Sequence, residues 1–91
     1  MKMYYCEILP DLQKVLQKLF KRNRALYGQV LKKIEEIITS FDAGHYKNLR
    51  HDLKDQKRVH IGHFVLVFSF IEQENKIIFV DFDHHDNIYD K

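Results

Sequence analysis

Cationic, imidazole and phenolic side chains occur in two short segments of the last third of the chain. Arg58 and His60 lie in the first segment, and His85 and Tyr89 lie in the second. Histidine titrates near neutral pH, so two histidines can act as base and acid in one reaction. An arginine can stabilise negative charge on a phosphate. If the fold joins the two segments, these residue types suit the binding or cutting of a phosphodiester backbone.

Each of these residues also has a purely structural interpretation. His60 and His85 could be ordinary exposed polar residues, because the chain contains six histidines. Arg58 could be a solvated surface cation. Tyr89 could stack on a base, an interaction that contributes about 1–3 kcal/mol, or it could help Ile88 to hold the C-terminus on the core. Residue type alone leaves both interpretations open.

Further cations near the first segment are candidates for binding RNA. They are Lys47, Arg50, Lys54 and Lys57. Neighbouring residues of a strand point to opposite faces, so Arg58 shares a face with His60, whereas Lys57 does not. Lysines of the predicted helices could extend this basic rim, although most such residues are simply solvated.

A metal site is the other chemistry considered for the second segment. Carboxylates and imidazoles are common metal ligands, and this part of the chain carries Asp81, Asp83, His84, His85 and Asp86. Their spacing matches no established zinc pattern, and the single cysteine offers no cysteine pair. The sequence therefore predicts no metal and no other cofactor.

Hydrophobic periodicity predicts a strand followed by two helices in the first half of the chain. Residues 3–9 suit a short strand, and Pro10 with Asp11 then offers a helix start, with Asp11 as a candidate N-cap. Apolar residues recur at helical spacing on both sides of a break at residues 22–24. The break is short, so the two helices are expected to be antiparallel neighbours. Gly44 is expected to mark the end of the second helical region.

The second half of the chain predicts three consecutive strands. A strand begins at Lys57, and residues 61–64 are typical of a tight hairpin in which Gly62 adopts positive φ. Phe64, Leu66, Phe68 and Phe70 alternate with smaller residues in the next strand. A second turn at residues 73–75 then leads into a final strand at residues 77–82.

Length and composition set the frame for these elements. Ninety-one residues, of which 45% are hydrophobic and 31% charged, predict one globular domain over residues 1–91. The net charge of +2 is too small to indicate nucleic acid by itself. No apolar run approaches the roughly 20 residues of a membrane span, and charged residues interrupt the N-terminal segment. Together with the single cysteine, these features favour a cytoplasmic protein and no membrane partner.

The order of elements predicts an α+β domain with the helical hairpin packed on one face of a mainly antiparallel sheet. The three C-terminal strands form a meander, and the N-terminal strand joins the same sheet. The aromatic strand face would pack under the helices. The opposite face would then be open to solvent and would present Arg58 and His60.

Three segments and the order of elements resemble the RelE/ParE toxin superfamily over essentially the whole chain. The segments are Leu-Arg-His-Asp-Leu-Lys at residues 49–54, Arg-Val-His-Ile-Gly at residues 58–62, and Asp-His-His-Asp-Asn-Ile-Tyr at residues 83–89. The resemblance implies the RelE/ParE-like fold and the toxin of a type II toxin–antitoxin system. RelE-like members cleave translated mRNA on the ribosome, through attack of the ribose 2′-hydroxyl on the adjacent phosphate, usually without a metal. ParE-like members instead inhibit DNA gyrase.

The same resemblance assigns catalytic positions to Arg58, His60, His85 and Tyr89. It implies that the histidines act as general base and general acid, that Arg58 stabilises the phosphate and that Tyr89 positions the nucleotide. The chain departs from the usual arginine-based pattern at Val65, Asp83 and His85. These departures resemble the histidine-dependent branch typified by YafQ, and they are also compatible with a gyrase inhibitor or with a catalytically inactive relic that still binds an antitoxin.

The implied partners are a cognate antitoxin, the ribosome and mRNA. An acidic, partly disordered antitoxin that folds on binding would complement the cationic face. It would neutralise the toxin by covering Arg58 and His60 or by displacing the segment that carries His85 and Tyr89. The residues after Phe82 are expected to make few contacts and to change most on antitoxin binding.

Overall fold

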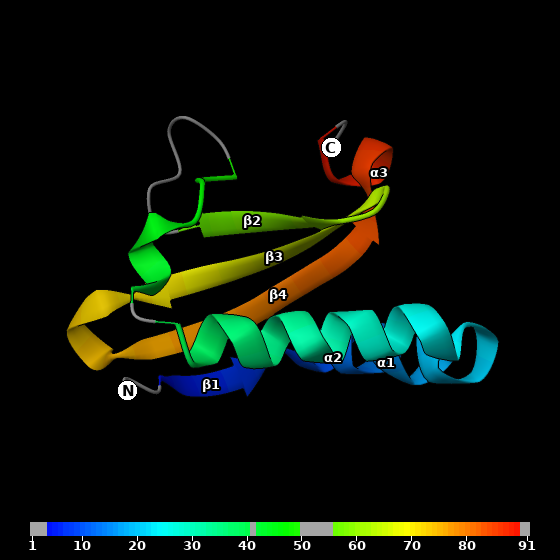
Figure 1. Ribbon diagram of the computed structural model, residues 1–91, viewed down its shortest axis with the longest axis horizontal. Helices are drawn as coiled ribbons and strands as arrows, with labels where there is room; N and C mark the ends of the chain where they lie inside the picture. Colours follow the sequence, from blue (N-terminus) through cyan, green and yellow to red (C-terminus); the bar gives the residue numbers. More distant parts are fainter. Residues whose placement is uncertain (1–3, 41, 50–55, 90–91) are drawn as a thin grey trace.

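A four-stranded sheet with two long helices along one face forms the body of the protein (Figure 1). The structure is a computed structural model that describes residues 4–40, 42–49 and 56–89. The strand order is β1-β4-β3-β2, with β1 parallel to β4 and the other pairs antiparallel. The strands are β1 (Tyr5–Ile8), β2 (Gln56–Ile61), β3 (Phe64–Ile71) and β4 (Lys76–His84). The predicted α+β class, the meander and the addition of the N-terminal strand to one sheet are confirmed.

The helical hairpin consists of α1 (Pro10–Arg22) and α2 (Arg24–Ile38). Asn23 ends α1 and begins α2, and its side chain accepts a hydrogen bond from the Leu26 amide at 3.1 Å. This cap satisfies one of the free amides at the start of α2. A single residue therefore makes the tight connection that the sequence predicts. None of the helices in the described ranges is long and apolar enough to cross a membrane.

Two predicted helix boundaries were wrong. Leu9 is the N-cap of α1, whereas Asp11 lies inside the first turn, behind Pro10. Pro10 starts the helix because its fixed φ suits the first turn and its missing N–H has no helical partner to lose. The second helix ends at Ile38, with Thr39 as its C-cap, and Gly44 instead belongs to a short 3-10 helix at Ala43–His45.

The main core lies between the helical hairpin and one face of the sheet. The helices contribute apolar residues at helical spacing, among them Leu12, Leu16, Val30, Ile34 and Ile37. The sheet contributes Leu66, Phe68, Ile77, Phe79 and Phe82. A β-bulge changes the alternation in β4, because Val67 pairs with Asp81 and Phe68 with Phe79, which leaves Val80 without a partner residue in β3. The bulge allows Phe79 and Phe82 to enter the same core.

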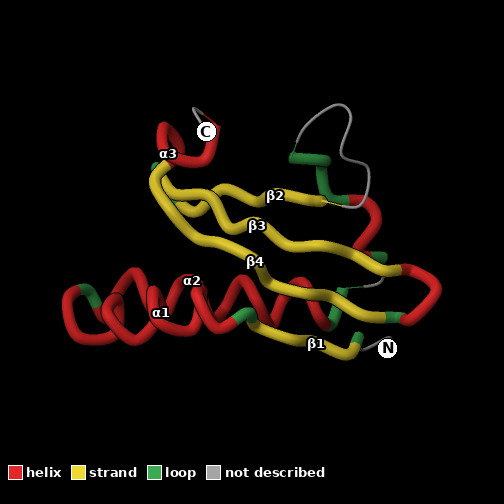
Figure 2. The backbone as a smooth tube through the Cα atoms, turned by 180° about the vertical axis from the view of Figure 1, so that it is seen from behind, coloured by secondary structure: helices red, strands yellow, loops and turns green. Residues whose placement is uncertain are grey.

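The opposite face of the sheet was expected to be open to solvent, but part of it is covered. Val65 and Val67 are buried on this face, and Ile88 packs on them from a short C-terminal helix, α3 (His85–Tyr89). Figures 1 and 2 show α3 at the end of β4, beside the turn between β2 and β3. Residues 83–89 thus complete β4 and form a helix, where a sparsely attached tail was expected. The reason is that Val65 and Val67 offer apolar surface that Ile88 can cover.

Candidate active site

Four predicted site residues meet on the face of the sheet that carries α3. Arg58 and His60 lie two residues apart on β2, and the Arg58 Nη1 atom is 2.9 Å from the His60 Nε2 atom. The His60 ring stacks on the His85 ring, with 5.7 Å between their centroids and 28° between their planes. The Tyr89 ring lies 4.6 Å from the His85 ring and 5.8 Å from the Arg58 guanidinium carbon. We call Arg58, His60, His85 and Tyr89 the four-residue cluster.

The hairpin and α3 hold the two halves of the four-residue cluster together. Gly62 has φ of +63° in the turn that returns β2 along β3, a conformation that favours glycine. The backbone N–H of His85 donates to the carbonyl of His63 in this turn, at 2.8 Å. Ile88, which is 7% exposed, fixes the other side of α3 on Val65 and Val67. His85 and Tyr89 therefore reach β2 although they follow β4 in the chain.

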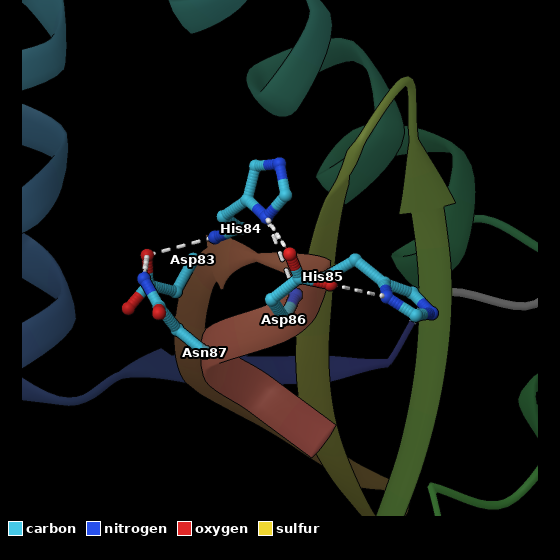
Figure 3. A network of polar contacts seen from close by, with 5 residues as sticks. All are labelled: Asp83, His84, His85, Asp86 and Asn87. Carbon is cyan, nitrogen blue, oxygen red and sulfur yellow. Dashed lines mark hydrogen bonds and ion pairs between the residues drawn. The ribbon is translucent and has the colours of Figure 1, made fainter. Parts of the chain in front are cut away.

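Polar contacts organise the start of α3 (Figure 3). The Asp83 Oδ1 atom accepts hydrogen bonds from the His84 amide at 2.7 Å and from the Asn87 side chain at 3.1 Å. The Asp86 amide donates to His84 Nδ1 at 3.2 Å. These bonds satisfy backbone donors that a helix start otherwise leaves free. Asp83, His84 and Asn87 thus support α3, which the sequence analysis did not foresee.

The environment of His60 favours its neutral form. Partial burial lowers the pKa of His60 below its ordinary value, and the positive charges of Arg58, His85 and Lys47 lower this pKa further. Arginine has hydrogen-bond donors only, so the Arg58 contact requires a lone pair on His60 Nε2. The proton of the neutral ring then resides on Nδ1. A neutral histidine of this kind can accept a proton.

Two buried polar atoms mark the floor of the four-residue cluster. The Arg58 Nε atom and the Tyr89 hydroxyl are shielded from solvent, and neither has a hydrogen-bond partner among the described residues. A buried polar group without a partner costs about 1–3 kcal/mol. Both groups can donate a hydrogen bond, and in this conformation neither is exposed to solvent.

Acidic residues lie on the same face, but on the far side of β3. Across the three strands, Arg58 aligns with Val67 and Asp81, and His60 aligns with Val65 and Asp83. Two strand spacings separate the cations from the carboxylates, a distance of about 10 Å. Asp81 accepts a hydrogen bond from the Phe82 amide at 2.9 Å, and Asp83 accepts one from the His84 amide at 2.7 Å. Ile88 packs on the valines between the two rows.

The cations predicted to bind RNA lie in different environments. The carbonyl of Lys47 accepts from the Arg58 amide at 3.0 Å, and the charge of Lys47 is close enough to lower the pKa of His60. Lys57 pairs with Phe68 and donates to Asn48 at 2.6 Å, so it supports the edge of β2 and does not join the four-residue cluster. The predictions for Arg50 and Lys54 lie outside the described residues.

A second pair of imidazoles escaped the sequence analysis. His63 stacks on His84 with 6.3 Å between ring centroids. The sequence contained a signal for this pair. The predicted turn at residues 61–64 places His63 at the end of the sheet where the final strand, and therefore His84, also ends. Within the described ranges, no group of three or more histidine, cysteine, aspartate or glutamate residues is arranged to hold a metal ion.

Comparison with known proteins links this chain to a family of toxins. Residues 7–89 match the sequence profile described as "ParE toxin of type II toxin-antitoxin system, parDE". A relative from Methanocaldococcus jannaschii, named "Putative toxin RelE4", is 58% identical over 90 residues, which cover 98% of this chain and 94% of the relative. An uncharacterized protein from Methanosarcina mazei is 41% identical over 88 residues, which cover 96% of this chain and all of that protein.

Solved toxin structures share the fold. A mutant of the Escherichia coli toxin RelE in the free state superposes with a TM-score of 0.72 at 16% identity, covering 97% of this chain and 92% of that one. A metal-bound toxin from Helicobacter pylori superposes with a TM-score of 0.68 at 25% identity, covering 96% of this chain and all of that one. The profile match and the archaeal relative identify this chain as a member of the RelE/ParE superfamily and as a toxin of a type II toxin–antitoxin system.

Proposed function

We propose that this toxin is an endoribonuclease that cleaves translated mRNA on the ribosome. The observation that carries the proposal is the convergence of Arg58, His60, His85 and Tyr89 from two distant segments into one cluster. A base, an acid, a cation and an aromatic ring are the groups that phosphodiester cleavage by a neighbouring hydroxyl requires. The ribosome as target would place this activity in the cytoplasm.

His60 is the general base in the proposed reaction, and His85 is the general acid. Neutral His60 takes the proton from the ribose 2′-hydroxyl, whose oxygen attacks the adjacent phosphorus. The bond from phosphorus to the 5′-oxygen breaks, and His85 gives its proton to that oxygen. The products are a 2′,3′-cyclic phosphate and a 5′-hydroxyl. The lowered pKa of His60 supports this assignment over the exchange of the two roles.

Arg58 has two successive partners in this scheme. In the free protein it donates to His60 Nε2 and so occupies the lone pair that the base needs. An incoming phosphate is a stronger partner for a guanidinium than a neutral imidazole is. Transfer of Arg58 to the phosphate would therefore free His60 at the moment when substrate binds. Tyr89 would contribute its ring or its hydroxyl to the nucleotide.

Cleavage of mRNA by purified toxin on programmed ribosomes tests the proposal. The wild type should cut ribosome-bound mRNA even when a metal chelator is present at a concentration that leaves the ribosomes intact. The cut mRNA should carry 2′,3′-cyclic phosphate ends. His60→Ala should lower the single-turnover cleavage rate by about 10²–10⁴-fold, the usual contribution of a positioned acid or base. His63→Ala removes an imidazole that lies outside the four-residue cluster and should keep wild-type activity. Equal rates for all three proteins would contradict the assignment.

Inhibition of DNA gyrase is the second candidate function. The specific observation in its favour is the profile match, which names ParE toxins. The two candidates differ in what accumulates after expression, because cleavage on ribosomes leaves cut mRNA and gyrase inhibition leaves damaged DNA. Supercoiling of relaxed plasmid by gyrase, measured with and without the toxin, should be unaffected if the nuclease proposal holds.

A further inference from the structure

A groove adjoins the four-residue cluster on the side of α2. It has a volume of about 260 Å³ and lies between α2 and the end of β2. Gln29, Lys32, Lys33 and Glu36 line it from the helix, and His60 and Gly62 line it from the hairpin. His60 lines the groove and also belongs to the four-residue cluster, so the two sites adjoin at the edge of β2.

The charges in the groove leave one cation available. Lys33 forms an ion pair with Glu36 at 3.3 Å, which offsets the carboxylate. Lys32 has no ion pair with any other described residue. A lysine ammonium of this kind suits a phosphate, and the Gln29 amide can both donate to and accept from a base edge. The groove therefore offers separate groups for the backbone and for the base of one nucleotide.

The edge of β2 adds backbone polarity to the same wall. Ile61 and Phe64 flank the two-residue turn, so they form a hydrogen-bonded pair. The N–H and C=O groups of the preceding residue, His60, therefore point away from β3. The next residue with this orientation, Arg58, donates its N–H to the Lys47 carbonyl. The segment at Lys47 covers β2 at that position, whereas at His60 the edge faces the groove.

We infer that this groove binds the nucleotide next to the scissile phosphate, with Lys32 on a phosphate of single-stranded RNA and Gln29 on the base. The inference rests on the proposed function, since it extends the same RNA from the four-residue cluster into the groove. An acidic peptide is the competing class of ligand for a cationic groove. The shared residue His60 favours RNA, because a strand bound at the cluster must leave it on one side and the groove adjoins the cluster there.

Binding of a short fluorescent RNA with 2′-O-methyl groups tests the inference without cleavage. The modified sugar cannot react, so binding is measured separately from the proposed nuclease activity. Lys32→Gln should weaken binding about tenfold and reduce the slope of log affinity against log salt by about 0.7, as expected for one lost phosphate contact on a single strand. Lys18→Gln is the matched control, because Lys18 lies on α1 and not in the groove. It should leave affinity and slope close to those of wild type.

Amide chemical shifts decide where the RNA lies. On titration with the same RNA, the amides of Gln29 and Gly62 should shift in the wild type and shift less in Lys32→Gln. The inference is overturned if Lys32→Gln binds as tightly as wild type, if Gln29 and Gly62 do not respond, or if the substitution weakens an antitoxin peptide and not RNA. Failure of mRNA cleavage with intact RNA binding would refute the nuclease proposal alone.

Discussion

His60 has the central place in the proposed reaction. Its imidazole contacts Arg58 through Nε2 and stacks on His85, so it is the link between β2 and α3. His60 is exposed, but partial desolvation lowers its pKa, and the charges of Arg58, His85 and Lys47 lower it further. The fold thus keeps one histidine of the pair ready to accept a proton.

A change at Arg58 should be visible in the titration of His60. In the wild type, the midpoint for His60 should lie below the ordinary value of about 6.5. Arg58→Gln removes a positive charge that opposes protonation, so the pKa of His60 should rise. It should not return fully to the ordinary value, because burial is the larger cause and remains. Titration of the imidazole resonances by NMR measures both values, with Lys18→Gln as a control; an unchanged midpoint in Arg58→Gln would show that the two side chains do not interact in solution.

The same shift gives a direction for stability. The unfolded chain binds a proton at His60 at higher pH than the folded chain does. The contribution of His60 to folding is therefore complete above the unfolded pKa and is lost as the pH falls through the folded pKa.

Among the elements, α3 determines whether the site exists. It has only five residues, too few for a helix that is stable alone. Its order depends on Ile88 over Val65 and Val67, and on the hydrogen bonds made by His63, Asp83 and His84. Val65 is fully buried in β3 and helps to dock the helix.

Truncation of Ile88 should separate the docking of α3 from the folding of the rest of the chain. Ile88→Ala should destabilise α3 by about 2 kcal/mol, near the lower end for an isoleucine truncated in a core. Amide hydrogen exchange of residues 85–89 should accelerate, while exchange in β3 should change little. Val15→Ala is the matched control, because it truncates an aliphatic side chain on α1 that is 36% exposed. Equal exchange in the two variants would mean that Ile88 does not hold α3.

Much of this arrangement could be predicted from the sequence, and the misses have physical causes. Period-two and helical patterns were sufficient for the strands and the hairpin, and strand parity correctly placed Arg58 with His60 on one face. The bulge at Val80 could not be predicted, because nothing in a single sequence marks the extra residue. The docking of α3 was also missed, because Ile88 contacts residues that are more than twenty positions earlier in the chain. The convergence of the four-residue cluster came from the family resemblance, not from residue spacing.

The whole molecule combines a modest positive charge with a type II toxin fold. Its net charge is +2, and two of its cations, Arg58 and Lys47, lie close to His60. The Escherichia coli RelBE toxin–antitoxin complex contains a chain of the same fold, at a TM-score of 0.66 and 15% identity. We expect an acidic cognate antitoxin to cover the cationic face of this toxin.

Salt should weaken that complex mainly through its rate of association. Exposed charges separated by more than about 8 Å are largely screened at physiological ionic strength. Raising the salt from 50 to 300 mM should therefore slow association of toxin and antitoxin, with a smaller change in dissociation. Surface plasmon resonance at several salt concentrations measures both rates. An association rate independent of salt would show that charge complementarity does not guide this partner.

Mapping of mRNA 5′ ends after induced expression tests the central claim most directly. The account predicts new 5′ ends within translated regions in cells that express the wild type. It predicts few such ends in cells that express the His60→Ala/His85→Ala double variant at the same level. If the double variant cut mRNA and arrested translation as strongly as the wild type, the four-residue cluster would not be the catalytic site. If the wild type produced no cuts but damaged DNA, the toxin would act on gyrase instead.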